Sequence, residues 1–126
     1  MRLRVSALRR CVNSTADVLH AATWFRSLPE LAGAFTPLDT FALLVAALVH
    51  DLQHPGYSNS FAVMAMDPLA LRYNDATVLE NHHAASFFSL TLGTPGANIL
   101  AGFPDTELRS LRTKIIQVRV CCRFSA

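Results

Sequence analysis

The sequence predicts an all-α fold, and two observations lead to this prediction. Apolar residues recur at helical spacing in several segments, whereas no stretch alternates apolar and polar residues with a period of two. Proline and glycine separate these segments, as at Pro29, Gly33, Pro37 and Gly93. Of the 126 residues, 52% are hydrophobic and only 16% are charged. We therefore expect a single domain at most, and favour part of a larger one.

The first two helices can be justified from their apolar patterns. Residues 16–28 place apolar side chains three and four positions apart, and Ser14 or Thr15 is available to cap them. Residues 38–50 include the most apolar run of the chain, Phe41–Val49. Because this run is apolar on all sides, we expect its helix to be buried in the centre of the fold.

Four shorter or later helices complete the prediction, over residues 58–66, 68–73, 77–92 and 106–118. Asp67 followed by a proline is a favoured start for the second of these. Asp105 is the expected cap of the last one. Trp24 and the pair Phe87-Phe88 are expected in the core.

Charge and cysteine content exclude some classes of protein. The net charge is +2, and the basic residues form no stripe interleaved with aromatics, so a nucleic-acid partner is not expected. Phe41–Val49 is far shorter than a membrane-spanning helix. Three cysteines without CxxC spacing favour a reducing compartment, with the cytoplasm as default. The arginine-rich residues 1–12 resemble an organelle transit peptide, but we favour an amphipathic helix or an internal start within a longer protein.

The segment from His50 to Gly56 is the strongest candidate site. It places His50 and Asp51 directly after the apolar run, with His54 four positions beyond His50. A buried carboxylate needs a cation, an arginine or dense hydrogen bonding, so the spacing slightly favours a metal site over a hydrogen-bonded helix end. Glu80 and His83 can share one helix face and could orient a ligand, although spacing alone favours a solvated polar face.

Three segments in a fixed order carry a resemblance to a known family. They are residues 50–61 (HDLQHPGYSNSF), 69–75 (LALRYND) and 78–84 (VLENHHA). Together they resemble the catalytic domain of the class I 3′,5′-cyclic-nucleotide phosphodiesterases, within the HD-domain metal hydrolases. The similarity covers about residues 13–117, the front part of that domain, with residues 118–126 as a divergent tail.

The resemblance implies an incomplete, multi-helical bundle of the HD and phosphodiesterase type. It also implies hydrolysis of cyclic AMP, cyclic GMP or both to the 5′-monophosphate in cyclic-nucleotide signal transduction. The cofactors implied are two divalent metal ions, Zn²⁺ together with Mg²⁺ or Mn²⁺, which supply a nucleophile at neutral pH. The partner would be the cyclic nucleotide, and the sequence leaves the oligomeric state open.

The resemblance also assigns roles to individual residues. His50 and Asp51 would bind metal. The residues that would hold water molecules around the metals or support their ligands are His54, Asn59, Glu80 and His83. Of these, His54 and Glu80 would take part in catalysis.

The chain departs from the family pattern at both ends. Val12 stands where the family has its general-acid histidine. Asn13-Ser14-Thr15 runs directly into Ala16, as if a metal-binding histidine and its neighbour were deleted. The similarity also stops near Gln117. Of the four protein ligands that the family provides for its more tightly bound metal ion, two therefore remain in this sequence. We expect an inactive fragment of a phosphodiesterase; the alternatives are a degenerate, non-catalytic binding module or another HD-type phosphohydrolase.

Overall fold

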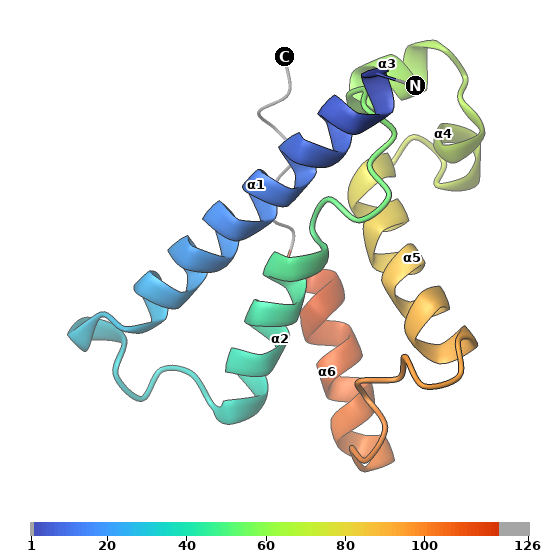
Figure 1. Ribbon diagram of the computed structural model, residues 1–126. Coiled ribbons are helices and arrows are strands. Elements are labelled where there is room, and N and C mark those ends of the chain that lie inside the picture. The colour runs from blue at the N-terminus through green and yellow to red at the C-terminus, as the bar shows by residue number, and fades with distance from the viewer. Residues whose placement is uncertain (1, 119–126) are drawn as a thin grey trace.

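The computed structural model describes the backbone of residues 2–118 and the side chains of residues 14–118. Within this part the fold is all-α, as predicted (Figure 1). Its elements are α1 (Arg2–Arg26), the short 3-10 helix η1 (Pro29–Leu31), α2 (Pro37–Val49), α3 (Asn59–Met64), α4 (Pro68–Arg72), α5 (Val78–Gly93) and α6 (Asp105–Gln117). No helix among these residues is long and apolar enough to cross a lipid bilayer.

The first helix is longer than predicted. It begins at Arg2 rather than near residue 16, because no proline or glycine precedes Pro29 to interrupt it. Ser14 lies inside this helix, so the prediction that it or its neighbour caps the helix is wrong. Trp24 is 59% exposed, and its predicted place in the core is also wrong.

The start of α2 is fixed by a capping box. The Thr36 hydroxyl accepts a hydrogen bond from the backbone N–H of Asp39, and the Asp39 carboxylate accepts one from the backbone N–H of Thr36. The same carboxylate forms an ion pair with Lys114, which joins α6 to the beginning of α2. One face of α2 is not buried, since Leu48 is 50% exposed. The prediction that this helix is buried on all sides is therefore wrong for that face.

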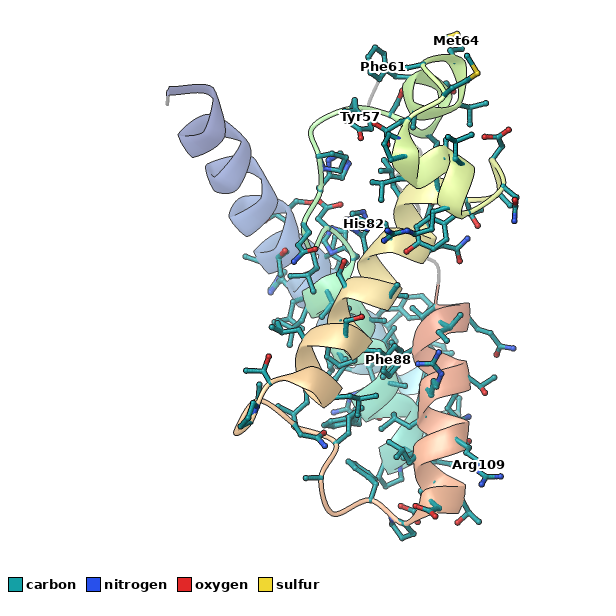
Figure 2. All side chains as sticks on the ribbon, turned by 90° about the vertical axis from the view of Figure 1, so that its right-hand side faces the viewer. Tyr57, Phe61, Met64, His82, Phe88 and Arg109 are labelled. Carbon is teal, nitrogen blue, oxygen red and sulfur yellow. The ribbon has the colours of Figure 1, made fainter. Side chains whose placement is uncertain are left out.

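The main core lies between α2, α5 and α6 (Figure 1). Its buried members are Ala42, Val45, Phe87, Phe88, Leu100, Leu111 and Ile115. Figure 2 shows Phe88 between α5 and α6, as its predicted burial requires. A second, smaller cluster joins α3 and α4 to the start of α5 through Ala62, Ala70 and Val78.

The remaining helix starts follow local capping chemistry. Asp67 caps α4, as predicted, and Ser58 caps α3. Asp105 is the first residue of α6 and not its cap, because Pro104 takes that position. The polypeptide descends along α5 and returns along α6, so the start of α5 lies at the same end of the bundle as the ends of α2 and α6 (Figure 1). The candidate site lies at this end.

Candidate metal centre

The site is built where α2 ends and α5 begins. His50 is the C-terminal cap of α2, and the loop that follows turns sharply at Gln53, with φ of 60°, and at Gly56, with φ of 96°. This turn brings the Leu52 carbonyl to α5, where it accepts a hydrogen bond from Nδ1 of His83 at 2.6 Å. Two segments that are 31 residues apart are thereby joined through a candidate site residue.

Three side chains at this junction could hold a metal ion together. Each of Asp51, His54 and His83 offers one ligand atom, and these atoms all lie within 4.8 Å of one another. His83 is 2% exposed, and its Nε2 is a buried atom without a hydrogen-bond partner among the described residues. Because an unsatisfied buried nitrogen costs free energy, its retention favours a ligand at that position. The His54 ring stacks on the His83 ring with centroids 5.5 Å apart.

Hydrogen bonds to the backbone show whether Nδ1 of each histidine ring donates or accepts. Nδ1 of His83 faces the Leu52 carbonyl, and Nδ1 of His50 lies 2.8 Å from the Ala47 carbonyl. A carbonyl can only accept, so in both rings Nδ1 carries the proton, which is the arrangement found in metal-binding histidines. His54 is the opposite case, because its Nδ1 accepts from the Gly56 N–H at 3.0 Å. The proton of a neutral His54 ring is then on Nε2, which makes it a hydrogen-bond donor.

The pKa shifts of His83 and Asp51 put both side chains in the protonation state that metal binding requires. Burial lowers the pKa of His83, more than its hydrogen bond to Leu52 raises it, so the ring is neutral at pH 7 and can bind a metal. His50 and Asp51 form a pair, with Nε2 of His50 3.3 Å from Oδ2 of Asp51. The hydrogen bond from His50 lowers the pKa of Asp51 to about 2, and the same bond raises the pKa of His50. Asp51 is therefore an anion under physiological conditions.

Ser14 joins this pair from α1. Its Oγ lies 3.1 Å from Nε2 of His50, which ties the middle of α1 to the end of α2. A hydrogen bond from Ser14 also contributes, less than the one from His50, to the lowered pKa of Asp51. Ser14 was expected at a helix cap, and no residue spacing indicated its place beside His50 and Asp51.

Asn59 and Glu80 form a second polar pair beside the site. The Asn59 amide donates to both carboxylate oxygens of Glu80, at 3.2 and 3.0 Å, and its oxygen accepts from the Leu79 N–H at 2.8 Å. Glu80 also lines a cavity of about 30 Å³ with His50 and His83. The predicted site residues Glu80 and Asn59 therefore contact each other, and Glu80 shares this cavity with the two histidines.

The residues present fit a divalent metal ion. A carboxylate with neutral imidazoles is a donor set that suits zinc and other first-row divalent ions. The ligand atoms converge, one of them is a buried nitrogen without a partner, and the carboxylate is ionised. The Val12 side chain and residues 119–126 lie outside the described part, so the predictions about the general acid and the divergent tail stay predictions.

Comparisons with known proteins agree with this chemistry. A family model described as 3′5′-cyclic nucleotide phosphodiesterase matches residues 12–120. The human high affinity cAMP-specific and IBMX-insensitive 3′,5′-cyclic phosphodiesterase 8A is 45% identical over 108 residues, which are 84% of this chain and 13% of the human protein. The Dictyostelium discoideum 3′,5′-cyclic-nucleotide phosphodiesterase regA is 41% identical over 102 residues, which are 81% of this chain and 13% of that protein.

A mouse relative is named for cGMP, whereas the human relative is named for cAMP. The Mus musculus high affinity cGMP-specific 3′,5′-cyclic phosphodiesterase 9A is 39% identical over 108 residues, covering 86% of this chain and 19% of the mouse protein. The chain thus spans less than a fifth of the length of these three relatives. The match to the family model covers most of the chain, and the chain belongs to the 3′,5′-cyclic nucleotide phosphodiesterase family.

Proposed function

We propose that residues 13–117 form the metal-binding front part of a phosphodiesterase domain that hydrolyses a cyclic nucleotide to its 5′-monophosphate. The observation that supports this most is the convergence of Asp51, His54 and His83, with Nε2 of His83 buried and without a hydrogen-bond partner among the described residues. Relatives named for cAMP and for cGMP match the chain at similar identity, so both nucleotides are proposed substrates. We expect the protein to act in the cytoplasm.

The proposed ligands are Asp51 and His83 from the converging group, together with His50, which contacts Asp51. The metal ions would be Zn²⁺ together with Mg²⁺ or Mn²⁺, and when bound they would lower the pKa of water and neutralise phosphoryl oxygens. His54 would hold its proton at Nε2 and donate it to an oxygen atom at the site. Asn59 would fix the orientation of the Glu80 carboxylate, which lines the same cavity as His50 and His83.

Metal binding by the purified chain tests the proposed ligands. Isothermal titration calorimetry with Zn²⁺ should give one site that Asp51→Asn and His83→Asn weaken at least about tenfold, because each change removes a ligand atom. The asparagine at position 83 can still donate to the Leu52 carbonyl. His20→Asn, which changes an exposed histidine of α1, is the matched control and should bind like the wild type. Unchanged Zn²⁺ affinity in both site variants would contradict the assignment.

A non-catalytic binding module is the second candidate, and one observation favours it. Ser14 contacts Nε2 of His50, the atom that a ligand role would need. For residues 1–126 alone we expect no hydrolysis under either function. The two functions differ in the longest natural protein that contains this sequence, assayed with cyclic AMP and cyclic GMP in Mg²⁺ and Zn²⁺. Release of the 5′-monophosphate supports the enzyme, and nucleotide binding without turnover supports the module.

A further inference from the structure

The Ser14 hydroxyl contacts the nitrogen atom through which His50 would bind a metal ion. It is 3.1 Å from Nε2 of His50, and that nitrogen is 3.3 Å from Oδ2 of Asp51. Two ligands on one tetrahedral zinc ion, with bonds of about 2.1 Å, have donor atoms about 3.4 Å apart. The distance between His50 and Asp51 is thus already close to that of a ligand pair.

Serine is a weak candidate for a ligand itself. Structural and catalytic zinc sites use thiolate, imidazole and carboxylate groups, whereas a neutral hydroxyl is not among their usual donors. Nε2 of His50 contacts both the Ser14 hydroxyl and the Asp51 carboxylate. A metal ion bound to Nε2 would displace the hydrogen bond between this nitrogen and Ser14. The hydroxyl and the metal therefore compete.

We propose that Ser14 is a positioning residue whose hydroxyl holds Nε2 of His50 until a divalent metal ion displaces it, and that it thereby sets the metal affinity of the site. This inference rests on the proposed function, because it assumes that a metal binds here. Displacement would also remove a hydrogen bond between the middle of α1 and the end of α2. Metal binding and the packing of α1 would then be coupled.

Calorimetric titration of the whole chain with Zn²⁺ tests this. Ser14→Ala should bind Zn²⁺ about threefold to tenfold more tightly than the wild type, which is the fold-change expected from removing one competing hydrogen bond. Ser14→Thr keeps the hydroxyl and should bind like the wild type. Thr23→Ala is the matched control, because its hydroxyl is exposed on α1 and donates only within that helix, to Leu19. Unchanged or weaker binding by Ser14→Ala would overturn the proposal.

A second pair of variants guards against loss of structure. Ser14→Thr and Ser14→Val have nearly the same shape and differ in the hydroxyl, so the valine variant should bind Zn²⁺ more tightly than the threonine variant. The increase in melting temperature on adding Zn²⁺ should follow the same order, because ligand stabilisation grows with affinity. Equal affinities would refute the role of Ser14 and leave the proposed function intact. Absence of Zn²⁺ binding in the wild type and every variant would refute the proposed function and this inference with it.

Discussion

Exchanging donor and acceptor between Asn59 and Glu80 would test how the start of α5 is held. Thr77, the residue before α5, has φ of 43° and provides no side-chain cap. Asn59 replaces that cap by accepting from the Leu79 N–H at 2.8 Å, while its amide donates to both oxygens of Glu80. One side chain from α3 therefore caps α5 and orients a candidate site residue.

The size of the effect follows from these bonds. Asn59→Asp keeps an acceptor for Leu79 but loses the donor and places a second carboxylate against Glu80. A hydrogen bond to a charged group contributes about 1.5–3 kcal/mol, and the repulsion adds to its loss, so we expect the free energy of unfolding to fall by about 2–4 kcal/mol. The double variant Asn59→Asp with Glu80→Gln restores a donor on the opposite side. It should recover at least about 1 kcal/mol.

Urea denaturation followed by far-UV circular dichroism at pH 7 measures both quantities. Asn59→Ala is a useful reference, because it removes the cap and the donor without adding charge; a lost cap alone costs about 0.5–2 kcal/mol. If the effects of Asn59→Asp and Glu80→Gln simply add to within about 0.5 kcal/mol, the two side chains do not interact in solution. That result would refute the orienting role proposed for Asn59.

Three further predictions concern the stability of the fold. Lys114→Met should remove part of the acid sensitivity of folding. The ion pair with Lys114 lowers the pKa of Asp39 to about 2. The Asp39 carboxylate therefore stabilises the fold above its unfolded pKa of about 3.9 and stops doing so as the pH falls toward 2. Urea titrations between pH 2 and 5 should give a flatter profile for the variant, and an unchanged profile would contradict the pair. Leu111→Ala should lower the free energy of unfolding by about 2–5 kcal/mol, because Leu111 is fully buried; a loss below 1 kcal/mol would contradict the core. Gln53→Gly should have a free energy of unfolding at least about 1 kcal/mol higher than Gln53→Val in urea denaturation. Both variants lose the hydrogen bond from Ser86, but only glycine accepts φ of 60° without strain. Equal midpoints would contradict the turn.

The sequence predicted the helical class and most helix boundaries because these depend on local signals. Ser58 and Asp67 cap their helices as their residue types suggest. Residues 1–12 were interpreted as an amphipathic helix or an internal start, but their continuity with the helix predicted over residues 16–28 was not expected. The change in composition after residue 12 does not end a helix, and no proline or glycine interrupts the chain there. Trp24 was misplaced because the side of a helix that packs depends on tertiary contacts, which periodicity alone does not determine.

For the candidate site, the sequence named the ionisable residues but not their arrangement. Asp51 and His83 lie far apart in the chain, and they meet where the turn at Gln53, with positive φ, presents the Leu52 carbonyl to His83. Positive φ at a glutamine carries no sequence signal, because that conformation is uncommon outside glycine. The contact between Ser14 and His50 depends on how α1 crosses α2, so residue spacing could not have indicated it.

The division of the ligand atoms between two elements has a consequence for metal binding. Asp51 follows α2 and His83 belongs to α5, and both helices pack on the core that contains Leu111. Holding ligands from separate helices within 4.8 Å requires that this core stay packed. Leu111→Ala should therefore weaken Zn²⁺ binding as well as stability, although no atom of Leu111 is a ligand. An exposed change on the same helix, such as Thr113→Ala, should leave both unaltered, and equal Zn²⁺ affinity in the two variants would show that the ligands converge without the core.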